Sequence, residues 1–119
     1  MKPAVYNFTV YQGSTWDQTF TWFQPDGVTP VNLTGCTARI QGRAKAASTS
    51  PVLFELTSTP AAGLTLGGTA GTVRVVIADE LSDAWNFKRC AYDLEIAFPD
   101  GTVQRLLMGS VTVDPEVTR

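Results

Sequence analysis

Along most of this chain, hydrophobic and polar residues alternate one by one. Residues 4–11 show the pattern first, with the larger hydrophobic side chains on one parity: Tyr6, Phe8 and Val10. Successive side chains of an extended strand point to opposite faces, so a period of two predicts a strand with one buried face. We therefore expect a first strand over residues 4–11, followed by a turn at residues 13–14.

The same alternation recurs in the rest of the chain. Residues 16–24 place Trp16, Phe20 and Trp22 on one parity, and the short turn before them predicts a hairpin with the first strand. Further strands are expected over 36–43, 52–58, 64–66, 72–78, 90–98 and 102–113. In the last of these the hydrophobic parity changes, which predicts a bulge near Gly109.

A helical pattern occurs over residues 79–86. Leu81, Ala84 and Trp85 follow the i, i+3, i+4 spacing, and Asp79 stands where an N-cap is expected. A helix this short is marginal on its own, so we expect Trp85 to hold it against one end of the core.

Together these elements predict an all-β fold. Short strands separated by turn signals are typical of an antiparallel, immunoglobulin-like β-sandwich, here of about seven to eight strands with one short helix near 79–86. A small barrel is the alternative architecture. The length of 119 residues fits one hydrophobic core, so we expect residues 1–119 to form a single domain.

Composition narrows the range of partners. Hydrophobic residues make up 44% of the chain and charged residues 17%, which argues against disorder driven by charge. The formal net charge of −2 is weak and has the wrong sign for phosphate backbones or anionic lipid, so we expect neither a nucleic-acid nor a membrane partner. Arg39, Arg43, Arg74 and Arg105 would form a basic stripe on neighbouring strands, but Asp93 and Glu95 would dilute it.

No membrane or secretory segment is expected. The longest uninterrupted hydrophobic run is Val75 to Ala78, and the N-terminus lacks the pattern of a signal peptide. Synthesis in a reducing cytoplasm favours free, buried thiols at Cys36 and Cys90, with a disulfide between them as the alternative.

Candidate catalytic groups have simpler explanations. The chain contains no histidine, the commonest general base and metal ligand. We interpret Asp93 and Glu95 as a solvated strand face, and Asp79 and Asp83 as part of a helix turn. The glycines at 67, 68 and 71 lack the spacing of a phosphate-binding loop. We predict no catalytic residue, no cofactor and no metal.

A surface for a protein partner is the remaining candidate site. Tyr11 and Phe23 have the outward parity, and residues 44–51 form a small, polar loop without periodicity. The predicted partner surface comprises Tyr11, Phe23, Lys45, Ser48 and Thr49. Trp16 and Trp22 would line a carbohydrate platform if exposed, but their parity predicts that they face the core.

Turn and strand motifs distributed over nearly the whole chain resemble a known family. The N-terminal half contains GSTW at 13–16, DG at 26–27 and LTGCTARIQ at 33–41; the second half contains AGTV at 70–73, YDLEI at 92–96, DGTV at 100–103 and GSVTVDPEVTR at 109–119. These motifs resemble small virion proteins of tailed bacteriophages and prophages, which have G-x-T-W, D-G and L-T-G-x-T-A-R-x-Q in this order. A looser similarity extends to the N-terminal β-sandwich domain of the phage baseplate upper protein.

This resemblance implies a structural virion protein without catalytic activity, located in the virion after synthesis in the host cytoplasm. Such a protein would act as an assembly or adaptor subunit of the tail, baseplate or neck. Its expected partners are other virion proteins and copies of itself, in a homo-oligomer that forms a ring or a trimer. A capsid decoration protein and a host-surface carbohydrate-binding module are the alternative functions.

Overall fold

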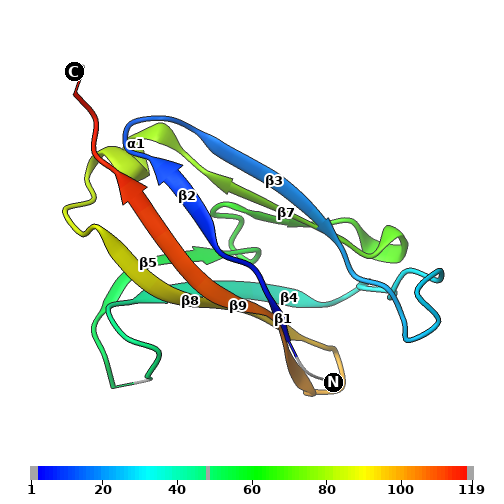
Figure 1. The fold of residues 1–119 in the computed structure, drawn as a ribbon. Helices are drawn as coiled ribbons and strands as arrows, with labels where there is room; N and C mark the ends of the chain where they lie inside the picture. The colour runs from blue at the N-terminus through cyan, green and yellow to red at the C-terminus, as the bar shows by residue number, and fades with distance from the viewer. Residues whose placement is uncertain (1–2, 48, 118–119) are drawn as a thin grey trace.

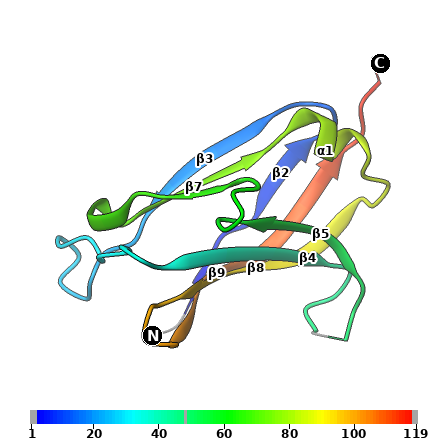
Figure 2. The ribbon, with the colours of Figure 1, turned by 180° about the vertical axis from the view of Figure 1, so that it is seen from behind.

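The computed structural model describes residues 3–47 and 49–117, in which two β-sheets pack face to face (Figures 1 and 2). The larger sheet contains, from one edge to the other, β1 (Ala4–Val5) and β2 (Phe8–Tyr11), then β9 (Val103–Asp114), β8 (Arg89–Ala97), β4 (Thr37–Arg43) and β5 (Val52–Thr57). The smaller sheet has the order β3 (Trp16–Thr21), β7 (Thr72–Ile77) and β6 (Leu64–Leu66). Because the sheets are separate, the described chain is a sandwich and not the alternative barrel.

The core lies between the sheets and follows the predicted parity. In β8 every second side chain is buried, and the same holds for β4 and β7. Among the residues completely shielded from solvent are Val10, Val73, Ile77, Leu94, Ile96 and Val111. Alternation in the sequence therefore reports which face of each strand meets the other sheet.

The first strand does not form the predicted hairpin. It is divided into β1 and β2, and both pair in parallel with β9 at the edge of the larger sheet, whereas β3 belongs to the smaller sheet. The prediction of a hairpin between 4–11 and 16–24 is therefore wrong, and the sandwich is not wholly antiparallel.

Gly109 explains where the first strand divides. A Cβ atom at Gly109 would lie 2.3 Å from the carbonyl oxygen of Tyr6, so only glycine lets the chain approach β9 this closely. The Oη of Tyr92 donates to the same carbonyl at 2.6 Å. The Asn7 Oδ1 accepts from the Ser110 backbone N–H at 2.9 Å. Between β1 and β2, these side-chain bonds accompany one backbone bond to β9, from the Tyr6 N–H to the Met108 carbonyl at 2.9 Å.

The predicted bulge in the last strand exists, but at a different residue. Leu94 pairs with Leu107 and Glu95 with Arg105, which leaves Leu106 as the extra residue of β9. Leu106 and Leu107 are both buried, so the change of parity occurs there and not at Gly109. As a consequence, Arg105 and Met108 both face the outer side of the sheet.

The short helix α1 spans Asp79–Asp83 and ends before the predicted boundary at residue 86. Its N-cap is Ala78, which has an extended backbone and no side-chain cap, so the prediction of Asp79 as N-cap is wrong. Tertiary contacts hold the helix instead: Ser82 is fully buried, and its Oγ accepts from the Gly13 backbone N–H at 3.0 Å. Trp85 is buried at this end of the core, as predicted.

Both cysteines are free. Cys90 pairs with Val111 near the start of β8, whereas Cys36 precedes the β4 residue that pairs with Ala97 at the other end of that strand. About seven strand residues, or roughly 20 Å, separate these positions, and a disulfide needs Cα atoms within about 7 Å. The alternative disulfide is therefore excluded.

Candidate functional site

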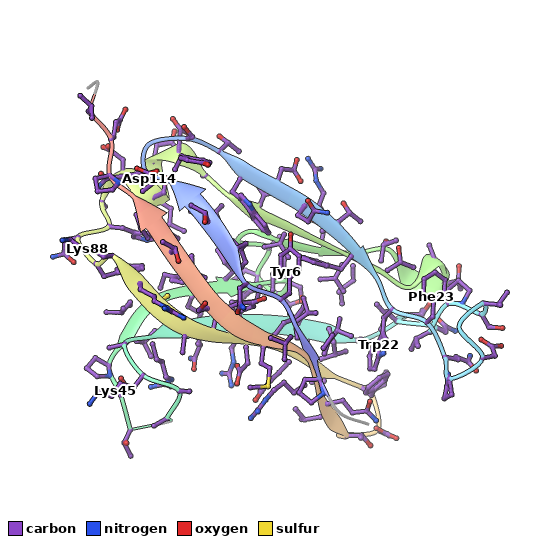
Figure 3. The ribbon with its side chains drawn as sticks, viewed as in Figure 1. Tyr6, Trp22, Phe23, Lys45, Lys88 and Asp114 are labelled. Carbon is purple, nitrogen blue, oxygen red and sulfur yellow. The ribbon has the colours of Figure 1, made fainter. Side chains whose placement is uncertain are left out.

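The predicted partner-surface residues are exposed, but they do not gather in one place. Tyr11 is 61% exposed at the end of β2, beside Asp114, and Phe23 is 43% exposed. Lys45 and Thr49 are exposed in the loop between β4 and β5, far from Phe23 (Figure 3). Ser48 lies outside the described residues. The structure thus divides these residues among three separate regions.

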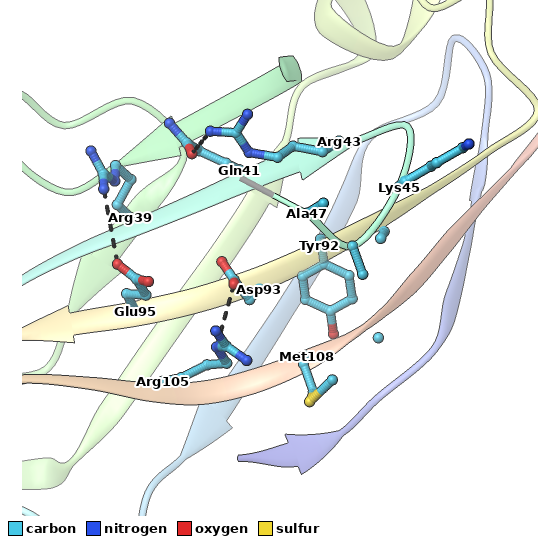
Figure 4. A pocket seen from close by; sticks show the side chains of 13 residues that line it. Arg39, Gln41, Arg43, Lys45, Ala47, Tyr92, Asp93, Glu95, Arg105 and Met108 are labelled. Atoms are coloured by element: carbon cyan, nitrogen blue, oxygen red, sulfur yellow. Dashed lines mark hydrogen bonds and ion pairs between the residues drawn. The ribbon is translucent and has the colours of Figure 1, made fainter. Parts of the chain in front are cut away.

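The Lys45 region lies beside a hollow. The outer face of the larger sheet contains a groove of about 340 Å³, lined by side chains of β4, β8 and β9 and walled by residues 45–47 (Figure 4). The polar side chains of its floor are Arg39, Gln41 and Arg43 on β4, Asp93 and Glu95 on β8, and Arg105 on β9. We call this feature the outer groove.

The bulge at Leu106 helps to build the outer groove. Arg105 and Met108 are three residues apart and would point to opposite faces of a regular strand. The extra residue between them turns both side chains to the outer face, where they line the groove. The change of hydrophobic parity in the sequence indicated that this strand has a bulge. It did not identify Leu106 as the extra residue.

Ion pairs connect the strands across the groove floor. Arg39 lies 3.9 Å from the carboxylate of Glu95, and Arg105 lies 3.4 Å from that of Asp93 (Figure 4). Gln41 donates to Glu55 on β5 at 2.6 Å and accepts from Arg43 at 2.9 Å. Each carboxylate on the floor of the groove is therefore engaged by a guanidinium of a neighbouring strand.

The loop wall is held at its base. Nη1 of Arg43 donates to the Ser50 carbonyl at 2.5 Å, and the Lys45 backbone N–H donates to Oγ of Ser50 at 3.0 Å. Four cationic side chains and two carboxylates line the groove, so it has a local excess of positive charge in a chain with a net charge of −2. This arrangement suits a polar partner that carries negative charge.

The predicted basic stripe forms only in part. Arg39, Arg43 and Arg105 share the outer groove with the two carboxylates that we expected to dilute their charge. Arg74 lies on the other sheet, where it donates to Asp17 at 2.6 Å. This hydrogen bond lowers the pKa of Asp17 and raises that of Arg74.

The environments of the two cysteine thiols do not favour nucleophilic catalysis. Burial raises the pKa of Cys90 to about 11, and burial together with Asp100 raises the pKa of Cys36. At neutral pH both remain protonated, the form that is a poor nucleophile. Within the described residues, no group of three or more His, Cys, Asp or Glu side chains is placed to hold a metal ion.

The tryptophans offer little open surface for a sugar. Trp22 is buried, and Trp16 is half-buried with Phe8 stacked on its ring at a centroid distance of 4.1 Å. Tyr6 and Phe20, also half-buried, complete this aromatic cluster between β2 and β3. The predicted inward parity of both tryptophans is confirmed.

Comparison with known proteins identifies the fold and no family. No protein-family model and no curated protein matches the chain. Among solved structures, the crystal structure of chicken TCR aligns with a TM-score of 0.53 and 13% sequence identity, over 98% of this chain. The alignment covers 55% of the TCR chain, so this chain spans about half its length. The predicted immunoglobulin-like β-sandwich is confirmed.

Helical segments of the described chain are short. Neither α1 nor the single 3₁₀ turn at Gly68–Ala70 is long and apolar enough to cross a membrane.

Proposed function

We propose that this chain is a non-catalytic structural subunit of a tailed-phage or prophage particle, an assembly or adaptor protein of the tail, baseplate or neck. The proposal starts from the resemblance of its turn and strand motifs to small virion proteins. A sandwich with exposed loops and sheet edges supports it, since such a body offers several surfaces to neighbouring subunits.

The outer groove is the observation that supports docking most directly. Its floor belongs to three paired strands and its wall to a loop fixed by Arg43, so little ordering is needed when a partner binds. Lys45 stands at the wall with an exposed side chain. We propose that an acidic segment of another virion protein binds here.

Particle composition tests the proposed function. We expect the chain in purified particles by mass spectrometry, and antibody labelling at the tail, baseplate or neck in electron micrographs. Label distributed over the head would favour capsid decoration instead. Absence of the chain from purified particles would refute the proposal.

Charge reversal tests the groove. Lys45→Glu places a negative charge at the groove wall, so we expect less of this variant in particles than of wild type. Lys88→Glu makes the same change at an exposed residue outside the groove and serves as the matched control. Equal incorporation of both variants would exclude the outer groove as the docking site.

A further inference from the structure

Strand β3 forms an open edge of the smaller sheet. Because β1 and β2 pair with β9, no strand of the described chain covers the outer edge of β3, which ends the smaller sheet (Figure 1). The strand extends over six residues, Trp16–Thr21, with a regular register to β7 and no bulge. It contains neither proline nor lysine, the residues that commonly block edge pairing.

Each of the other edges is shorter, interrupted or partly occupied. The edge formed by β1 and β2 is interrupted at residues 6–7, and β6 has only three residues. Strand β5 follows Pro51, and its last residue, Thr57, already exchanges backbone hydrogen bonds with Ala62. Of these edges, β3 is the one that is regular and open along its whole length, which suits it to pairing with another strand.

Backbone geometry identifies the groups that are available on β3. The Trp22 N–H donates to the Gly71 carbonyl at 2.8 Å, so the even-numbered residues of β3 direct their N–H and C=O groups to β7. The backbone N–H and C=O groups of the odd-numbered residues therefore face the open edge; these residues are Asp17, Thr19 and Thr21. Their side chains are all exposed.

We propose that this edge pairs with the same edge of a second copy of the chain, antiparallel and about a two-fold axis through Thr19. In this register Thr19 faces Thr19 of the second copy, and Asp17 faces Thr21. Each of these pairs exchanges two backbone hydrogen bonds, which uses all the free groups of the odd-numbered residues. The two smaller sheets become one continuous sheet across the dimer.

Side chains agree with this register. Threonine pairs and a carboxylate opposite a threonine are favourable cross-strand neighbours, and the two Asp17 carboxylates lie about 14 Å apart. Gln18 of one copy lies opposite Phe20 of the other, and covers part of an aromatic side chain that is only half-buried in the monomer. No like charges meet across the two-fold axis.

This inference rests on the proposed assembly function and adds the partner and its geometry. Two-fold pairing is isologous, so it gives a dimer or an assembly with an even number of copies, and disfavours a trimer. A single strand pair is a small interface, and we expect a dissociation constant in the micromolar range or weaker, about 10–500 μM.

Opposite charges at residue 21 test the register. Thr21→Lys places an ammonium opposite Asp17 of the second copy and should tighten the dimer, whereas Thr21→Asp places two carboxylates together and should weaken it. Each contact occurs twice, so we expect the two dissociation constants to differ by about tenfold or more in sedimentation equilibrium. Thr37→Lys and Thr37→Asp make the same changes at an exposed threonine of β4 in the larger sheet and should leave the constant unchanged.

Amide exchange gives a second measurement that needs no variant. The amides of Asp17, Thr19 and Thr21 should become protected as the wild-type concentration rises through the dissociation constant. A chain that stays monomeric up to about 1 mM, or a dimer whose constant does not distinguish the two residue 21 variants, would overturn the proposal. Equal responses at residues 21 and 37 would also overturn it. None of these outcomes bears on whether the chain is present in particles, which tests the proposed function separately.

Discussion

At the scale of single residues, parity along a strand identified which side chains enter the core. Side-chain size decided how closely neighbouring strands and rings approach each other. Gly42 and Gly109 both stand on inward-facing parities where a larger residue would be expected. A Cβ at Gly42 would lie 2.0 Å from the ring of Phe54, and one at Gly109 would meet the Tyr6 carbonyl. Both glycines therefore make space for a specific neighbour, which no local pattern could predict.

Trp22 provides the first stability prediction. Its side chain is 7% exposed and its ring lies 6.0 Å from that of Phe98. Trp22→Ala removes a large core side chain, and we expect the free energy of unfolding to fall by about 3–5 kcal/mol. Urea denaturation measures the change. Phe23→Ala is the neighbouring control, with an expected effect within about 0.5 kcal/mol; similar losses in both variants would contradict the assignment of Trp22 to the core.

Asp26 provides a prediction about pH. Its carboxylate accepts from the Thr29 hydroxyl at 2.6 Å and from the Thr29 and Val28 backbone N–H groups at 2.8 Å, and these bonds lower its pKa. A lowered pKa in the folded state stabilises the protein above the unfolded value of about 4, and this contribution is lost as the pH falls through the folded pKa.

The measurement compares wild type with Asp26→Asn in urea. We expect the variant to have the lower midpoint at neutral pH, and the difference between the two to shrink from about pH 5 to about pH 2. Thr29→Val removes the hydroxyl that lowers the pKa of Asp26 most. We therefore expect its midpoint at neutral pH to lie below that of wild type as well. A gap that stays constant with pH would show that the charge of Asp26 is unimportant.

At the scale of elements, strands were easier to predict than their partners. The residue ranges of β4, β5, β6, β7 and β8 agree with the predicted strands within one or two residues. The first strand was located but assigned to the wrong sheet, since alternation shows that a strand has a buried face and says nothing of which edge it joins. In the predicted hairpin the first strand would cover the edge of β3, so the open edge was not predicted.

Gln12 connects three elements and gives a further prediction. Its Nε2 donates to the Trp85 carbonyl at 2.8 Å and to that of Asp83 at 3.3 Å, and its Oε1 accepts from the Glu116 N–H at 3.0 Å. Gln12→Ala removes all of these bonds, and we expect a loss of about 1–3 kcal/mol in the free energy of unfolding.

The Gln12 variant should also release α1 locally. Amide exchange of residues 80–85 is expected to accelerate more than that of β8. Gln24→Ala changes an exposed glutamine in a turn and serves as the control. Unchanged exchange around α1 would show that Ser82 and Trp85 hold the helix without Gln12.

At the scale of the whole molecule, the buried thiol of Cys90 reports global opening. It is 2% exposed between the sheets, and its pKa is raised to about 11 by burial. In a Cys36→Ser variant, we expect reaction of Cys90 with a thiol reagent near pH 8 to be slow and to follow unfolding in urea.

The reciprocal variant supplies the comparison. In Cys90→Ser the remaining thiol, Cys36, is half-buried, and we expect it to react at least about tenfold faster than Cys90. Comparable rates in native buffer would mean that Cys90 is reached without global unfolding.

The candidate site was predictable only in its parts. Loop 44–51 followed from its composition, and the outward parity of Arg39, Arg43 and Arg105 from alternation. Their convergence depends on strand order and on the bulge at Leu106, both of which result from long-range pairing. Arg74 has the same outward parity but lies on the other sheet.

The sequence alone determined the β class, most strand positions and the side chains that enter the core, because these follow from local periodicity and burial. Tertiary structure decided which strands are neighbours, where the first strand is divided and which edge stays open. Strand order and the open edge depend on contacts between residues far apart in the chain, such as those of Tyr6 with Gly109 and Tyr92. The hydrophobic pattern of a short segment carries no information about the free energy of such contacts.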